Sequence, residues 1–280
     1  MRWDRPLGRE EEKEAGVPVR ILVSFIQLAA LGTVLAAATQ AQGVSVPEVL
    51  KSGQIRVGGE AHSFDLFVPE REEHAQPMPL LVAVHGAGGD GLSQIRAWLP
   101  VARANRCVLL APNIDNSPEA WDRLYDHPEW IRDAIDALSQ SYPIDRHRLY
   151  LWGYSAGGMF AFYFGFVESR YFAAAAVHGG VIENFKYQMA DFAVRKIPFA
   201  YYIGTRDQWW STKQARASRD ALLARGFDVH YVELKGGDHN FFARSGEITT
   251  DAWAFLEQHS LEGEPSFDAL DLGKIKKALR

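Results

Sequence analysis

Short apolar runs of strand length alternate with helix-length segments from residue 80 to residue 259. The first pair is Leu80–His85, an apolar run that ends in histidine, and Leu92–Asn105, where apolar residues recur every three or four positions. The same alternation predicts strands at Cys107–Ala111, Leu149–Gly153, Ala173–Val177, Phe199–Ile203 and Val229–Leu234, and helices at Pro128–Ser139, Ser155–Val167, Thr212–Arg225 and Ile248–His259. Apolar strands that alternate with helices form a mostly parallel sheet with both faces covered. The sequence therefore predicts one α/β domain.

Two shorter strand patterns precede this alternation, at Gln54–Val57 and Ser63–Val68, with Gly58-Gly59 between them. Strand patterns separated by a glycine-rich turn are typical of a hairpin. We therefore expect an N-terminal antiparallel hairpin. At the other end, the charged segment Leu261–Arg280 is predicted to be a tail that contains one helix from Phe267.

An uncharged apolar run near the N-terminus, Ile21–Ala38, is typical of a secretory signal peptide. Arg20 precedes the run, and a small-x-small cleavage pattern ending at Ala41 follows it. We expect residues 1–41 to be removed, leaving a secreted or periplasmic domain at 42–260 with no stable membrane anchor. The alternative is a retained anchor, because the 18 residues of the run are just long enough to span a bilayer.

The first 18 residues fit a signal peptide poorly, because four glutamates lie between Glu10 and Glu14. One hypothesis is that translation begins at Val19, read as Met from a GTG codon. The signal would then start with a short basic segment and continue directly into the apolar run.

Composition adds three limits to this picture. The chain has 280 residues, 47% of them hydrophobic, and a formal net charge of −5, which suits one large globular domain. Without an excess or a cluster of Lys and Arg, a nucleic-acid partner is not expected. The only cysteine, Cys107, lies in the predicted buried strand "RCVLLAP", so we expect a packed, unreactive thiol and no internal disulfide.

The loop after the first strand of the alternation satisfies two different glycine patterns. Gly86–Gly91, "GAGGDG", matches the G-x-G-x-x-G of a dinucleotide-binding turn. With His85 it also matches His-Gly-x-Gly-Gly, a pattern that supplies oxyanion holes in serine hydrolases. The loop thus predicts either a pyrophosphate site or a site for the negative oxygen of an acyl-transfer intermediate.

A candidate nucleophile lies in Leu149–Gly158, "LYLWGYSAGG". Gly153–Gly157 fits G-x-S-x-G, and Ser155 falls between a predicted buried strand and a predicted helix, which is the context that a nucleophile elbow requires. The alternative is a glycine-rich helix start with Ser155 as its N-cap. The context favours the nucleophile.

A serine nucleophile needs a base, and the base needs an orienting carboxylate. Asp207 follows a predicted strand and a glycine turn in "FAYYIGTRD", and His239 follows the next strand in "VHYVELKGGDH". This gives the order Ser, acid, His of α/β-hydrolases, with both side chains after the carboxyl ends of strands. Asp207 is therefore the predicted acid and His239 the predicted base.

Other residues compete for these roles. Asp238 adjoins His239, but adjacent loop side chains usually diverge, and Asp228 lies at the opposite end of its strand. His178 follows a strand end and is an alternative base or a residue of the cleft wall. The remaining histidines are expected on the surface or in packing, and no H-E-x-x-H motif or His/Cys cluster indicates a metal.

These residues together favour the hydrolase interpretation of the glycine loop. The dinucleotide alternative keeps some support, because Asp115 lies near the expected separation from the loop, although beyond a proline. The hydrolase interpretation accounts for the nucleophile, acid, base and loop at once, and it needs no cofactor. Backbone N–H groups of Ala87 and Ala156 are then expected to form the oxyanion hole.

At this point the sequence resembles the α/β-hydrolase superfamily, and within it the feruloyl and acetyl-xylan esterases and the polyhydroxybutyrate-depolymerase-like esterases. The resemblance runs from about Gly53 to His259, and is strongest in "VAVHGAGG", "PIDRHRLYLWGYSAGGMFAFYF", "FAAAAVHGG", "GTRDQWW" and "GGDHNFF". It implies the α/β-hydrolase fold and the roles predicted above for Ser155, Asp207 and His239. Dienelactone hydrolases are similar in layout but use Cys at the position of Ser155, which argues against their activity here.

The sequence says less about the substrate. Tyr154, Trp209 and Trp210 adjoin the predicted nucleophile and acid and are candidate substrate-binding residues, with His178 and, more weakly, Trp121. We expect a small-molecule or oligomeric ester and a fairly open cleft, because only a short helical flap fits between Gly180 and Ile197. The leading prediction is a secreted serine carboxylesterase. The alternatives are a prolyl-oligopeptidase-like peptidase, an acyltransferase and a cell-envelope binding protein.

Overall fold

The computed structural model describes residues 24–25, 45–72, 75–115, 117, 120–121, 124–125 and 127–267, without the side chains of 24–25 and 184–186. Nearly all of the predicted signal peptide and the predicted helix beyond Phe267 lie outside this part of the chain. Within it, no helix has the length and apolar character needed to cross a membrane.

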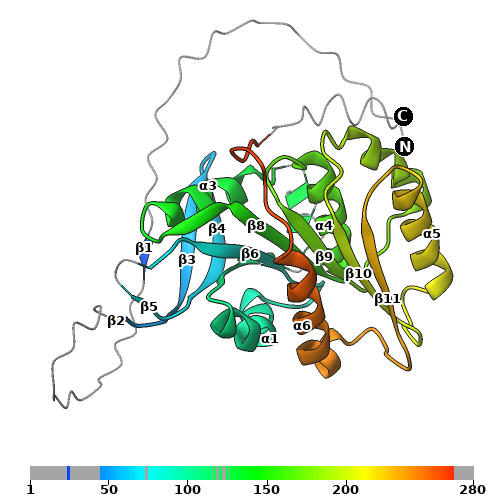
Figure 1. Cartoon of the computed structure of the whole chain (residues 1–280), viewed down its shortest axis with the longest axis horizontal. Helices are drawn as coiled ribbons and strands as arrows, with labels where there is room; N and C mark the ends of the chain where they lie inside the picture. Colours follow the sequence, from blue (N-terminus) through cyan, green and yellow to red (C-terminus); the bar gives the residue numbers. More distant parts are fainter. Residues whose placement is uncertain are drawn as a thin grey trace, which may run out of the picture.

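A nine-stranded sheet in the order β1-β3-β4-β7-β6-β8-β9-β10-β11 forms the centre of the fold (Figure 1). Its strands are β1 (Ser24–Phe25), β3 (Val49–Val57), β4 (Glu60–Val68), β6 (Met78–Val84), β7 (Val108–Asn113), β8 (Ile144–Tyr154), β9 (Ala174–His178), β10 (Phe199–Gly204) and β11 (Val229–Leu234). In this order, the neighbouring strands from β7 through β6, β8, β9 and β10 to β11 pair in parallel. The pairs β1–β3, β3–β4 and β4–β7 are antiparallel. The predicted parallel sheet and N-terminal hairpin are confirmed.

Helices cover both faces of the sheet, as Figure 1 shows. They are α1 (Gly91–Ala104) and α6 (Ser245–Leu256) on one face, and α3 (Glu129–Ser139), α4 (Ala156–Val167) and α5 (Thr212–Leu223) on the other. Side chains along β6 alternate between the two cores: Leu80 and Val82 join the core under α3, α4 and α5, whereas Leu81 and Ala83 join the core under α1 and α6. A strand buried on both faces must be apolar at every position, which explains the uninterrupted run in the sequence.

The observed boundaries of several strands and short elements differ from the predicted ones, because the local pattern of apolar and polar residues carries little information there. The hairpin strands extend further than their β-rich runs, although the turn falls at Gly58 and Gly59, both with positive φ, as predicted. Five short elements were not predicted as such. The strand β1 lies within the run predicted to be a signal peptide and pairs with β3. The others are β2 (Ser45–Val46) and β5 (Arg71–Glu72), which pair with each other, and the 3₁₀ segments η1 (Asn184–Phe192) and η2 (Phe241–Arg244). The segment η1 occupies the interval where the sequence allowed only a short helical flap.

The prediction for Cys107 is confirmed, since its thiol is buried and burial raises its pKa. The first residues of the predicted tail pack against the domain. The backbone N–H of Leu261 donates to the carbonyl oxygen of His147 at 2.9 Å, and the ring of Phe267 contacts Tyr171 at 5.3 Å between centroids.

Candidate active site

Ser155 occupies a strained turn between β8 and α4. Its φ is 56° and its ψ −117°, and Arg106 is the other non-glycine residue of the described chain with positive φ. Such a conformation costs of order 1–3 kcal/mol and persists only where its surroundings enforce it. The neighbouring glycines allow the turn, because a Cβ at Gly153 would lie 2.1 Å from the carbonyl oxygen of Gly157. The prediction of an elbow rather than an ordinary N-cap fits this geometry, since the Ser155 side chain makes no cap hydrogen bond.

A hydrogen-bonded chain links Ser155, His239 and Asp207, which we call the Ser–His–Asp chain. The Nε2 atom of His239 lies 2.8 Å from the Oγ of Ser155, and its Nδ1 lies 2.7 Å from Oδ2 of Asp207. With Nδ1–H donating to the carboxylate, Nε2 is left to accept the hydroxyl proton. Ser155 follows the carboxyl end of β8, Asp207 that of β10 and His239 that of β11. The parallel sheet therefore brings the three residues to one edge.

Asp207 is held as a carboxylate in an enclosed position. Its side chain is 0% exposed, and its Oδ1 accepts hydrogen bonds from the backbone N–H groups of Trp209 at 2.8 Å and Trp210 at 2.9 Å. Burial alone would raise the Asp207 pKa, but the hydrogen bonds from His239 and the two amides outweigh it and lower that pKa. A negative charge is therefore maintained beside the Nδ1–H of His239.

The glycine loop after β6 lies directly against Ser155. A Cβ at Gly86 would come within 2.9 Å of the Ser155 Cβ, so only glycine allows this approach. A turn with Gly89 N–H donating to the Gly86 carbonyl at 3.0 Å and a φ of +78° at Gly88 set the path of the loop. Ala87, at the tip of this turn, is exposed.

His85 fastens this loop to the end of β7. It is buried, its Nδ1 lies 2.7 Å from the carbonyl oxygen of Gly86, and its Nε2 accepts a hydrogen bond from the Ile114 backbone N–H at 3.0 Å. Burial lowers the His85 pKa, so the ring is neutral, with Nδ1–H as donor and Nε2 as acceptor. The sequence indicates His85 only as part of the glycine motif and carries no signal of this role.

The same loop does not offer a pyrophosphate site. Dinucleotide-binding turns use the free N–H groups at the start of the following helix. Here Asp90 caps α1 by accepting from the Ser93 N–H at 2.7 Å, and the side chain of Asn113 accepts from the Gly91 N–H at 2.7 Å. These amides are satisfied, and the capping carboxylate would repel an anion. The dinucleotide alternative is therefore wrong.

The rival acids and the rival base are placed elsewhere. Asp238 turns its carboxylate to the Asn240 N–H at 2.9 Å, and the carbonyl of Asp228 pairs with the Phe199 N–H at the opposite edge of the sheet. His178 is 1% exposed, and burial, with the nearby His239, lowers its pKa to about 4. The side chain of His178 is therefore buried rather than exposed in a cleft wall, and its backbone carbonyl accepts from the Ser155 N–H at 2.9 Å.

The candidate substrate-binding aromatics differ in their surroundings. Trp209 is exposed, and its ring centroid lies 6.3 Å from that of His239. Trp210 is partly buried against the core. Tyr154 is half-buried, and its hydroxyl donates to the carbonyl oxygen of His239 at 3.0 Å. Phe242 was not predicted as part of the site, yet it is exposed and lies 5.7 Å from the Tyr154 ring.

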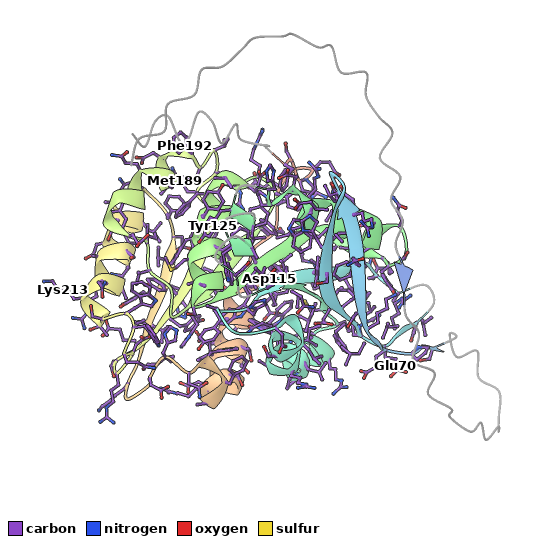
Figure 2. The ribbon with its side chains drawn as sticks, turned by 180° about the vertical axis from the view of Figure 1, so that it is seen from behind. Glu70, Asp115, Tyr125, Met189, Phe192 and Lys213 are labelled. Atoms are coloured by element: carbon purple, nitrogen blue, oxygen red, sulfur yellow. The ribbon has the colours of Figure 1, made fainter. Side chains whose placement is uncertain are left out.

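A cavity of about 420 Å³ lies between the hairpin turn, the end of β7 and the start of α3. Its lining includes His62, Asn113, Asp115 and Trp130, and no member of the Ser–His–Asp chain. Figure 2, which views the molecule from behind, labels Asp115 and Tyr125 of the connection that follows β7. The cavity borders β7, whereas Ser155 follows β8, and β6 lies between these two strands. We therefore assign the chemistry to the Ser–His–Asp chain and not to the cavity. The described residues contain no cluster of potential metal ligands.

Fold and geometry together define an α/β-hydrolase. Residues 115–260 match the Dienelactone hydrolase family, and the chain belongs to that family. It is similar to a bifunctional acetylxylan esterase/xylanase from Neocallimastix patriciarum, with 25% identity over 237 residues that cover 72% of this chain and 34% of the relative. The chain thus corresponds to about a third of that relative's length.

Solved structures show the same fold. An S-formylglutathione hydrolase from Staphylococcus aureus has a TM-score of 0.65 at 17% identity, covering 78% of this chain and 100% of that one. A ferulic acid esterase from Anaeromyces mucronatus has a TM-score of 0.61 at 15% identity, covering 83% and 95%. The chain is thus a member of a hydrolase family and has the α/β-hydrolase fold.

Proposed function

We propose that the protein is a serine carboxylesterase that works through an acyl-enzyme, with Ser155 as nucleophile, His239 as general base and acid, and Asp207 as the orienting carboxylate. The observation that carries the proposal is the pair of short contacts in the Ser–His–Asp chain, 2.8 Å and 2.7 Å, at a residue with positive φ. A hydroxyl alone is a weak nucleophile, and this arrangement gives it a proton acceptor of fixed tautomer.

In the first half-reaction, the Ser155 Oγ attacks the ester carbonyl carbon while His239 Nε2 takes the hydroxyl proton. The imidazolium then donates that proton to the alcohol oxygen as the carbon–oxygen bond breaks. In the second half, water attacks the acyl-enzyme, His239 accepts a water proton, and the proton returns to Ser155 as the acid leaves. The Asp207 carboxylate stabilises the imidazolium in both halves.

The negative oxygen formed in each half-reaction is assigned to the backbone N–H groups of Ala87 and Ala156. The close approach of Gly86 to Ser155 and the fastening of the loop by His85 support this assignment. Donors that are fixed before the reaction stabilise the developing charge without reorganisation, and each is worth about 10²–10³ in rate.

The substrate class is proposed by similarity and by sequence. The name of the relative from Neocallimastix patriciarum favours acetylated sugars, and feruloyl and hydroxyalkanoate esters are the next to test. The apolar run Ile21–Ala38 supports action outside the cytoplasm. We do not extend the family's name to a dienelactone substrate, because Ser155 stands where those enzymes use cysteine.

Hydrolysis of short 4-nitrophenyl esters by the purified chain tests the proposal. Ser155→Ala is expected to reduce turnover by a factor on the order of 10⁶. Ser141→Ala, which changes an exposed serine in the turn after α3, is the matched control and should retain activity. Equal activity of wild type and Ser155→Ala contradicts the proposal, as does a folded wild type that is inactive on esters but cleaves peptides or transfers acyl groups.

A further inference from the structure

The exposed aromatic side chains of this protein gather beside His239. The exposed large hydrophobic residues of the described chain are Leu50, Val194, Trp209, Leu223 and Phe242, and only two of them are aromatic. Trp209 is 70% exposed and contacts the imidazole of His239. Phe242 is 43% exposed and contacts Tyr154, whose ring lies 5.4 Å from that imidazole. Single exposed apolar residues are common, but two large aromatics beside a reactive group indicate a ligand contact.

Local hydrogen bonds fix the backbone at both positions. The Trp209 N–H donates to Oδ1 of Asp207 at 2.8 Å, and the Phe242 N–H donates to the side chain of Asn240 at 3.1 Å. The adjacent Phe241 is 0% exposed and anchors η2 in the core. Phe242 is thereby turned outward by the conformation of the segment, so both rings are presented in defined places next to His239.

The chemistry of the site determines which part of an ester lies there. His239 Nε2 must donate a proton to the leaving oxygen, so that oxygen lies within about 2.6–3.2 Å of Nε2. The carbonyl oxygen points toward the loop after β6. The sheet order β6-β8-β9-β10 places this loop on one side of Ser155 and the loop after β10, which carries Trp209, on the other. Phe242 contacts Tyr154, whose ring packs on the imidazole of His239. The group nearest these rings is therefore the alcohol.

We propose that Trp209 and Phe242 form the binding surface for the alcohol part of the ester and favour alcohols that carry a ring with an apolar face, a sugar or an aryl ring. The inference rests on the proposed function and assigns its leaving-group specificity to two residues. A flat apolar ring face packs on an aromatic side chain, whereas a methyl group covers little of either surface.

Two ester series separate alcohol selectivity from acyl selectivity. The first keeps the acetyl group and varies the alcohol: methanol, phenol and a methyl pentoside. The second keeps methanol and varies the acid: acetate, butyrate and benzoate. Hydrolysis is followed as acid release for wild type, Trp209→Ala, Phe242→Ala and the control Leu223→Ala, which removes an exposed apolar side chain at the end of α5.

In Trp209→Ala and Phe242→Ala, the ratio of kcat/KM for ring alcohols to that for methanol should fall about twofold to tenfold, mainly through KM. The acyl series should keep its wild-type order, and Leu223→Ala should keep all ratios. Comparison of the two ring alcohols, phenol and the methyl pentoside, shows whether the surface prefers an aryl ring or a sugar: the preferred ring is the one whose kcat/KM ratio falls more. An unchanged alcohol ratio, or a change confined to the acyl series, overturns the inference. A wild type that hydrolyses neither series instead contradicts the proposed function.

Discussion

The hydroxyl of Tyr154 donates a hydrogen bond to the backbone carbonyl of His239 at 3.0 Å. Tyr154 immediately precedes Ser155, so one hydrogen bond ties the strand that carries the candidate nucleophile to the loop that carries the candidate base. The ring of Tyr154 also packs on the imidazole, with 5.4 Å between centroids. The 2.8 Å contact between Ser155 and His239 thus has support outside the Ser–His–Asp chain.

Tyr154→Phe keeps the ring contacts and removes this hydrogen bond. We expect a loss of about 1 kcal/mol in the free energy of unfolding and a fall of about fivefold in kcat with little change in KM. The control is Tyr150→Phe on the same strand, which removes an equivalent hydrogen bond to the carbonyl of His259. Urea unfolding and steady-state kinetics of both variants check this prediction. Equal kcat in the two variants would contradict a positioning role for Tyr154.

Asp207→Asn tests which carboxylate orients His239. The variant keeps an oxygen for the Trp209 and Trp210 amides but cannot hold Nδ1–H as a carboxylate does, so kcat should fall by about 10⁴. Asp238→Asn is the comparison, because Asp238 adjoins His239 and directs its carboxylate to the Asn240 N–H. We expect Asp238→Asn to change kcat less than tenfold. A larger loss in Asp238→Asn than in Asp207→Asn would reverse the assignment.

Gly179→Ala should damage activity more than stability. Gly179 has a φ of +62°, and a Cβ there would lie 3.0 Å from Cε1 and 3.2 Å from Nδ1 of His239. Gly226 has a φ of +79° and no atom within 4 Å of the added Cβ, so Gly226→Ala isolates backbone strain. Both variants should lose about 1–2 kcal/mol from the left-handed conformation. Only Gly179→Ala should lose kcat, by an expected tenfold or more, because the imidazole must shift.

The free energy of unfolding should fall as the pH is lowered from 6.5 to 4. Burial lowers the His178 pKa to about 4 from its usual 6.5, so within this window the unfolded chain binds a proton that the folded chain does not. The loss is about 1.4 kcal/mol per pH unit, or about 3 kcal/mol across the window. Asp207, whose pKa is lowered, contributes stability that is lost only below about pH 4.

Urea unfolding of wild type and His178→Gln between pH 4 and pH 7 measures this effect. The variant should show a shallower dependence of the free energy of unfolding on pH. His85, whose pKa burial also lowers, adds a slope of the same sign to both proteins and cancels in the comparison. Parallel curves for the two proteins would show that His178 does not take up the proton on unfolding.

The succession of elements could be read from the sequence because their signals are local. The strand at Val229–Leu234 was predicted with the limits that the structure shows. The helix after the elbow begins at Ala156 rather than Ser155, since the strained backbone of Ser155 cannot belong to a helix. The residues of the Ser–His–Asp chain could also be named in advance, because parallel strands bring their carboxyl ends to one edge.

Packing between distant segments decided the rest. Phe241 and Phe242 are neighbours of the same type, yet one is 0% and the other 43% exposed, which no sequence period indicates. The sequence predicts that both His178 and His239 follow strand ends, but His178 is the last residue of β9, where the register with β8 pairs it with Tyr154 and buries it. The sequence by itself determined the order of the elements and the candidate catalytic side chains. The tertiary structure decided which side chains face solvent, because burial depends on contacts between residues far apart in the chain.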